Sequence, residues 1–214
     1  MSQNQNTDSL YEYDTAVRNE CNHIVLCGVD EAGRGPLAGD VFAAAVIFDD
    51  SVRIEGINDS KKLTEKKRNT LYDEIIQNAT AYCIARATVD EIETLNILQA
   101  SMLAMKRAVE GLGVHPDLVM ADGNKCPDIP DTQVRAVIKG DAYSASIAAA
   151  SILAKVSRDR YMEEMSELYP MYCFDKHKGY GTKLHYEKID KFGPSEIHRL
   201  SFLRKYYEKK GTGE

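Results

Sequence analysis

Four acidic residues each follow an apolar segment and precede a turn. Asp30 and Glu31 close the segment HIVLCGV, Asp122 closes LVMA, and Asp141 follows AVIKG. Strand ends that feed turns can meet at one edge of a sheet, where ligands bind. Four carboxylates gathered there repel one another unless divalent cations neutralise them, and oxygen-only ligands favour Mg²⁺ or Mn²⁺ over zinc. The pattern predicts such a metal site; the alternative is four separate solvated acids at loop starts.

The adjacent pair Asp30 and Glu31 raises a geometric problem, because neighbouring side chains on a flat strand point to opposite faces. Both residues can serve one site only if the strand ends or bulges there, or if one contributes its backbone carbonyl.

A helix starting at Ser144 combines hydroxyls and cations on one face. At 100° per residue, Ser144, Ser151 and Lys155 lie within about 40° of one another, with Arg158 beside them. The opposite face is apolar, so the polar face predicts contacts to phosphate oxygens. The alternative is a merely solvated face. We interpret Asp159 as a structural partner of Arg158 or Arg160.

A second candidate phosphate clamp lies earlier in the chain. It consists of Asn58, Ser60, Lys61 and Lys62, with looser electrostatic support from Lys66, Lys67 and Arg68.

The elements that must position these residues are predicted from the spacing of apolar residues and from the turn-forming residues that interrupt it. Apolar runs predict strands at 23–30, 41–48, 80–88, 117–121 and 133–139. Helical spacing predicts helices at 10–21, from Thr64 as N-cap, at 94–110 and from Ser144 to about Met165. Strands that alternate with helices, after two adjacent strands, indicate an α/β domain with a mixed five-stranded sheet.

Composition agrees with one globular domain. The chain has 214 residues, 43% of them hydrophobic, which is enough for a single full core. We expect a cytoplasmic protein without membrane contact, because the N-terminus lacks a signal pattern and no apolar run approaches the roughly 20 residues of a membrane span. The five cysteines have no zinc spacing and are expected to be reduced.

The net charge of −6 is unevenly distributed. The first 60 residues carry 3 basic and 11 acidic side chains, whereas residues 176–210 carry ten basic and four acidic ones. A nucleic-acid backbone responds to such local basic patches and not to the total charge. Nucleic-acid binding is therefore compatible with this composition.

Several blocks of the sequence together resemble bacterial ribonuclease HII. They are GVDEAGRGPLAG at 28–39, NDSKKL at 58–63, ADG at 121–123, KGD at 139–141, SIAAASILAKVSRDR at 146–160, HKGYGT at 177–182 and HRLSF at 198–202. The resemblance implies a ribonuclease H-like fold with a C-terminal helical extension. It also implies hydrolysis of the RNA strand of RNA/DNA hybrids and incision 5′ to single ribonucleotides in duplex DNA.

Carried over residue by residue, the resemblance implies that Asp30, Glu31, Asp122 and Asp141 hold two Mg²⁺ or Mn²⁺ ions. Asp30 would bridge both ions and Glu31 would act through its main-chain carbonyl. One ion would activate the attacking water and the other would stabilise the departing 3′ oxygen, leaving 5′-phosphate and 3′-hydroxyl ends.

The 2′-hydroxyl is what distinguishes RNA from DNA. Gly33, Arg34 and Gly35 suit its recognition, because glycines allow close approach of the main chain and Pro36 biases Gly35 toward an extended conformation. The alternative is an ordinary tight turn. Tyr180 matches the family's aromatic residue that stacks on the sugar of the following deoxynucleotide.

Type HIII ribonucleases share the acidic opening motif, but they usually carry an extra N-terminal domain and a Glu as the last acid. The last acid here is Asp141, so the resemblance favours type HII. We expect a polar tail and short helix at 1–22, a catalytic domain at 23–190, a helical extension and tail at 191–214, and a monomer. The alternative function is a non-catalytic hybrid-binding protein, which a complete acidic quartet disfavours.

Overall fold

A mixed five-stranded sheet forms the centre of the computed structural model, which describes residues 3–22 and 24–211. The strands are β1 (Leu26–Ala32), β2 (Val41–Ile47), β3 (Ala81–Ala87), β4 (Leu118–Asp122) and β5 (Gln133–Val137), in the spatial order β3-β2-β1-β4-β5. β1, β2 and β3 pair antiparallel, whereas β4 and β5 lie parallel to β1. The predicted α/β fold class and mixed sheet are confirmed.

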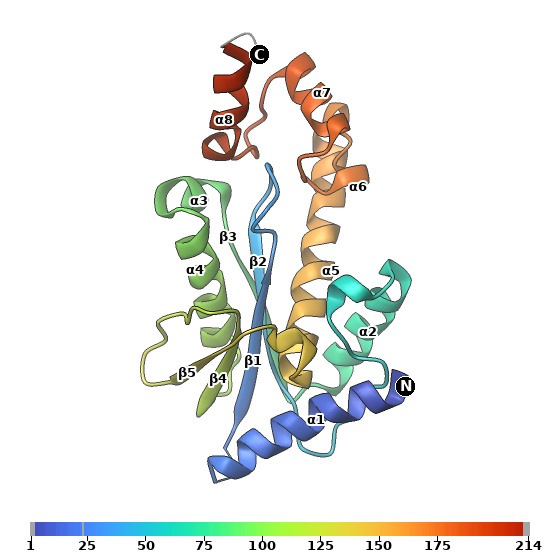
Figure 1. The fold of residues 1–214 in the computed structure, drawn as a ribbon, viewed down its shortest axis with the longest axis vertical. Helices are drawn as coiled ribbons and strands as arrows, with labels where there is room; N and C mark the ends of the chain where they lie inside the picture. Colours follow the sequence, from blue (N-terminus) through green and yellow to red (C-terminus); the bar gives the residue numbers. More distant parts are fainter. Residues whose placement is uncertain (1–2, 23, 212–214) are drawn as a thin grey trace.

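Helices cover both faces of this sheet (Figure 1). One face packs against α4 (Ile97–Glu110), and the other packs against the long helix α5 (Ala145–Leu168) and α2 (Glu65–Asn78). Every residue of β2 is buried, because alternate side chains enter the two apolar layers. At Gly28 of β1, an added Cβ would collide with the α5 backbone at Ser146. The missing side chain therefore lets α5 lie directly against β1.

The N-terminal segment is more ordered than predicted. The helix α1 runs Gln3–Glu20 and not from Leu10, so the expected polar tail is wrong from residue 3 onward. Leu10 and Tyr11 are buried in the α5-side core, and the buried Asp14 carboxylate accepts hydrogen bonds from the Ser146 amide and hydroxyl at 2.9 and 2.7 Å. These contacts, which local sequence does not reveal, hold α1 against the start of α5.

The predicted helix at 94–110 is divided in two. The helix α3 (Val89–Leu95) begins at a capping box formed by Thr88 and Glu91, and α4 begins after Asn96. Asn96 has a φ of 72° and its side chain accepts from the amides of Leu98 and Gln99. Its left-handed conformation breaks the helix there, and its side chain caps the new one.

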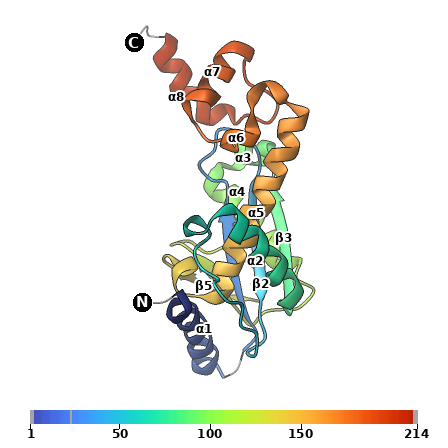
Figure 2. The same cartoon turned by 90° about the vertical axis from the view of Figure 1, so that its right-hand side faces the viewer.

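The C-terminal part lies at the end of the molecule opposite α1 (Figure 2). It contains α6 (Phe174–His177), α7 (Lys183–Phe192) and α8 (Leu200–Gly211). The predicted domain boundary at 190 falls inside α7, while residue 23 and residues 212–214 of the predicted domains lie outside the described residues. Within the described part of the chain, no helix combines the length and apolarity needed to cross a membrane.

Candidate active site

Three of the four predicted acids converge at one sheet edge. Val29 of β1 pairs with Ala121 of β4 in parallel register, so the next residues, Asp30 and Asp122, follow side by side near the carboxyl ends of the two strands. Asp141 reaches them from the 3₁₀ turn Gly140–Ala142 that follows β5. One carboxylate oxygen from each of Asp30, Asp122 and Asp141 lies within 4.8 Å of the others. The predicted convergence of these residues is confirmed.

The turn that delivers Asp141 is itself fastened to the cluster. The Gly140 amide donates to Asp122 Oδ1 at 2.6 Å. A Cβ at Gly140 would press on Ile147 of α5 and on Val137. Glycine therefore allows the turn to fit between β5 and α5 while its amide reaches the acid.

Electrostatics favour a cation at this cluster. Burial raises the pKa of Asp30 well above its usual range, and the charges of Glu31 and Asp122 raise it further. Burial also raises the pKa of Asp141 to about 6, with Asp122 adding to the rise. Such shifts mean that the surrounding protein provides too little positive charge and hydrogen bonding to stabilise the ionised carboxylates. An all-oxygen donor set of this charge fits a hard divalent cation such as Mg²⁺ or Mn²⁺.

Lys61 supplies part of the missing positive charge. Its Nζ lies 3.8 Å from Asp141 Oδ2 and its side chain is largely exposed. Burial opposes the charge on Lys61, but the carboxylates of Asp30 and Asp141 outweigh this and raise its pKa. An exposed ammonium at this distance compensates a buried acid only weakly.

Glu31 lies outside the three-acid cluster. Its carboxylate Oε1 accepts from Arg34 at 3.3 Å, and its amide donates to Asp30 Oδ1 at 2.7 Å. Burial raises the pKa of Glu31 despite the nearby guanidinium of Arg34. The strand alternation that separates the two side chains thus persists at the end of β1.

Two serines connect the cluster to α5 and to the 3₁₀ turn Ser60–Lys62. Ser151 hydrogen-bonds to the Asp30 carboxylate, and its Oγ lies 2.7 Å from Ser60 Oγ. Both serines are buried. They therefore orient an acid of the cluster and are not free surface hydroxyls.

A cavity of about 320 Å³ opens beside the cluster. Its lining includes one predicted acid and eight residues predicted to bind substrate: Glu31, Gly33, Arg34, Gly35, Ser60, Lys61, Ser151, Lys155 and Tyr180; Ala32 completes it. Tyr180 is exposed, and a Cβ at Gly35 would lie 3.8 Å from Tyr180 Cε1. The loop and the tyrosine, 145 positions apart in sequence, therefore form adjacent parts of one wall.

A second hollow of about 590 Å³ lies on the other side of Lys61. It is lined by Asp59, Lys62, Asp122 and Asp141 together with residues of the β4–β5 connection. Lys62 Nζ lies 3.9 Å from Asp59 Oδ2, and Asn58 Oδ1 accepts from the Asp59 amide at 2.8 Å. The predicted 58–62 clamp thus borders the cluster, although only its two lysines extend outward.

The predicted phosphate-binding face of α5 is wrong at two residues. Ser144 is fully buried, where it caps α5 by accepting from the Ile147 amide. Arg158 is 1% exposed and donates to the carbonyls of Ala38, Asp40 and Lys178. Helical spacing cannot reveal that other segments cover this face.

Lys155 and Asp159 form an ion pair with Nζ–Oδ1 at 2.5 Å. The expectation that Asp159 pairs with Arg158 or Arg160 is wrong, since an acid four residues after a lysine lies on the same helix face. Lys155 lines the 320 Å³ cavity with its charge already partnered.

Sequence reasoning missed the role of Arg199 in the architecture of the site. This side chain is 0% exposed, and its guanidinium donates to the carbonyls of Gly33, Arg34, Pro36 and Gly39. Arg199 belongs to the HRLSF block, but no local signal relates it to a loop about 160 residues earlier.

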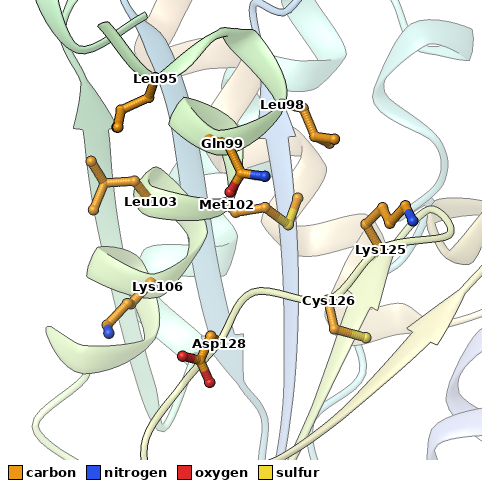
Figure 3. A pocket seen from close by; sticks show the side chains of 9 residues that line it. All are labelled: Leu95, Leu98, Gln99, Met102, Leu103, Lys106, Lys125, Cys126 and Asp128. Atoms are coloured by element: carbon orange, nitrogen blue, oxygen red, sulfur yellow. The ribbon is translucent and has the colours of Figure 1, made fainter.

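The hollow in Figure 3 is separate from the acidic cluster. It has a volume of about 400 Å³ between α4 and the β4–β5 connection. Its lining is mainly apolar, with Leu95, Leu98, Met102 and Leu103 beside Lys106 and Lys125. It contains none of the predicted site residues.

Comparison with known proteins identifies a family. The ribonuclease HII family model matches residues 27–205. A ribonuclease HII of Caldicellulosiruptor bescii is 55% identical over 197 residues, covering 92% of this chain and 95% of that protein. One of Paraburkholderia xenovorans is 57% identical over 192 residues, covering 88% and 77%.

A solved structure agrees with these sequences. The crystal structure of the ribonuclease H2 from Pyrococcus horikoshii OT3 has a TM-score of 0.70 and 28% identity, covering 86% of this chain and 97% of that one. The match to the HII model, over most of the chain, supports the preference for type HII over type HIII. The chain therefore belongs to the ribonuclease HII family of endoribonucleases, which are divalent-metal-dependent ribonucleases H.

Proposed function

We propose that this chain hydrolyses the RNA strand of RNA/DNA hybrids and incises on the 5′ side of single ribonucleotides in duplex DNA, with two divalent ions. The observation that carries the proposal is the cluster of three carboxylate oxygens within 4.8 Å of one another, next to the cavity lined by Gly33, Arg34 and Gly35. A charge-dense acidic site thus lies beside a cavity that is lined in part by the glycine-containing loop.

In this proposal Asp30, Asp122 and Asp141 hold Mg²⁺ or Mn²⁺, and Glu31 contributes through its main-chain carbonyl. Bound divalent cations in such a site supply activation of a water and stabilisation of the departing 3′ oxygen. Asp30 is oriented by the Ser151 hydroxyl and by the Glu31 amide. These contacts keep its carboxylate directed at the cluster.

The loop beside the cluster reads the ribose. Among the described residues, the amides of Arg34 and Gly35 have no hydrogen-bond acceptor. They are therefore available to the 2′-hydroxyl, while Tyr180 packs against the following sugar. A deoxynucleotide would leave such groups unpaired, at about 1–3 kcal/mol for each.

Phosphate contacts come from the exposed lysines beside the cluster. Lys61 borders both hollows and Lys62 borders the larger one, and both side chains extend toward solvent. Lys155 supports them from the cavity wall, with its charge shared with Asp159. We retain a monomer and the cytoplasm as the expected state and location of the protein.

The test is cleavage of a DNA duplex that contains one ribonucleotide, with and without Mg²⁺. We expect one cut 5′ to the ribonucleotide, with 5′-phosphate and 3′-hydroxyl ends, and no cut in Asp30→Asn. Tight binding without metal-dependent cleavage would favour the non-catalytic alternative. Cleavage of an all-DNA duplex at a similar rate would refute the role of the 2′-hydroxyl.

A further inference from the structure

The loop that borders the cavity has an unusual hydrogen-bond pattern. The carbonyls of Gly33, Arg34, Pro36 and Gly39 all accept from the Arg199 guanidinium, at 2.6–3.1 Å. The Leu37 carbonyl accepts from the Arg199 amide at 2.8 Å. Because the carbonyls point inward at one buried cation, the loop is held with its free amides directed away from it.

A second chain of contacts ends at Tyr180. His198 Nδ1 accepts from the Ser195 amide at 2.8 Å, so the proton of His198 resides on Nε2. That Nε2–H donates to His185 Nε2 at 3.0 Å, and His185 Nδ1–H donates to the Tyr180 carbonyl at 3.0 Å. The protons are thus assigned in one direction, from His198 to the main chain of Tyr180.

These two systems start from neighbouring residues. His198 and Arg199 are consecutive, and they precede α8 directly. The segment is fixed on both sides, since Ala38 pairs with His198 in a β-bridge and the Gly39 amide donates to the Ile197 carbonyl. One dipeptide is therefore linked to both parts of the cavity wall, directly through Arg199 and by way of His185 through His198.

We propose that His198 and Arg199 form a clamp that positions the ribose-reading surface: Arg199 orients the 33–39 loop and His198, through His185, places Tyr180. This inference rests on the proposed function. Both are positioning residues, because neither lines the cavity. Their role is to set selectivity for a ribonucleotide, not general affinity for a duplex.

The burial of both residues supports the assignment. Arg199 is 0% and His198 2% exposed. Burial lowers the pKa of Arg199 to about 9 and that of His198 to about 4. At neutral pH the arginine is charged and donates with its whole guanidinium, whereas the histidine is neutral, as the one-directional chain requires.

The experiment measures ribonucleotide preference, defined as Kd for an all-DNA duplex divided by Kd for the same duplex with one ribonucleotide. Asp30→Asn serves as the background to prevent cleavage. Arg199→Lys retains the charge but not the fork that reaches several carbonyls. His198→Asn retains an acceptor for the Ser195 amide but removes the donor to His185.

We expect each variant to lower the preference about 10-fold, the effect of losing about 1.4 kcal/mol from one contact, with all-DNA affinity unchanged. Arg18→Lys is the matched control, because Arg18 is also buried and donates to a backbone carbonyl, that of Phe48, far from the cavity. Thermal unfolding identifies which variants fold, and a single folded variant, Arg199→Lys or His198→Asn, is enough to decide the test.

Two outcomes separate the inference from its basis. If the Asp30→Asn parent has no preference, the proposed function fails and the inference fails with it. If the parent has a preference that folded Arg199→Lys or His198→Asn retains, the clamp is wrong and the proposed function stands.

Amide hydrogen exchange of Arg34 and Gly35, in the Asp30→Asn protein with His198 and Arg199 unchanged, adds a measurement that needs no clamp variant. Exchange of these two amides should slow only when the ribonucleotide duplex is bound. Equal slowing with both duplexes would overturn the assignment of this loop surface to the ribose.

Discussion

The acidic cluster should cost the metal-free protein stability, and Asp141→Asn should recover part of that cost while inactivating the enzyme. Asp141 lies near the carboxylates of Asp30, Asp122 and Asp59. Asparagine has nearly the same shape but carries no charge, so the substitution removes repulsion without leaving a cavity. It also removes one proposed metal ligand, so we expect turnover to be lost.

The magnitude follows from the pKa of Asp141, which burial and Asp122 raise from 3.8 to about 6. Well below pH 3.8 the group is protonated in both states and costs nothing. Between pH 4 and 6 the unfolded chain loses its proton first, so the folded state loses stability as pH rises. Above pH 6 the penalty is constant, at about 3 kcal/mol for a shift of about two units. Solvent in the adjacent hollow screens the charges, so we expect about 1–3 kcal/mol.

The assay is urea unfolding in EDTA at pH 4 and pH 7.5. We expect Asp141→Asn to exceed the wild type by about 1–3 kcal/mol at pH 7.5 and by no more than about 0.5 kcal/mol at pH 4. Added Mg²⁺ should close the gap at pH 7.5, because binding stabilises the wild type. Asp73→Asn, at an exposed carboxylate of α2, is the control and should change neither value. A variant that is less stable than the wild type at pH 7.5, or equally displaced at both pH values, would refute the reasoning.

Three further predictions concern the substrate surface and the orientation of Asp30. Gly35→Val and Tyr180→Ala should each lower kcat/KM on a one-ribonucleotide duplex by about 10-fold or more, and Arg34→Ala less, because it retains the loop backbone; wild-type rates for the first two would locate ribose recognition elsewhere. Lys61→Ala should flatten the dependence of log Kd on log salt by about one ion, and Lys155→Ala by less because of its pairing with Asp159; equal slopes for Lys61→Ala and wild type would remove Lys61 from the phosphate contacts. Ser151→Ala should move the acid limb of the pH–rate profile to higher pH, since the Ser151 hydroxyl lowers the pKa of Asp30; an unmoved limb would show that this bond does not set the titration.

The amino-acid sequence by itself determined the strands and the positions of the acids. The apolar runs that are bounded by turn residues correspond to β1 to β5, and Thr64 caps α2 as predicted. Asp30 and Asp122 could be placed together because each follows an apolar segment near the end of a strand, and parallel neighbours end at one edge. Local pattern is sufficient there, since alternation and strand ends are properties of a few consecutive residues.

Only the tertiary structure decided what covers each polar face. Helical spacing put Ser144, Ser151 and Arg158 on one face of the helix, yet all three are buried, and Ser144 and Arg158 bind backbone, not phosphate. Arg199 satisfies carbonyls of a loop more than 150 residues away. A buried arginine and an exposed one have the same sequence signature, because burial depends on which distant segment packs against the side chain.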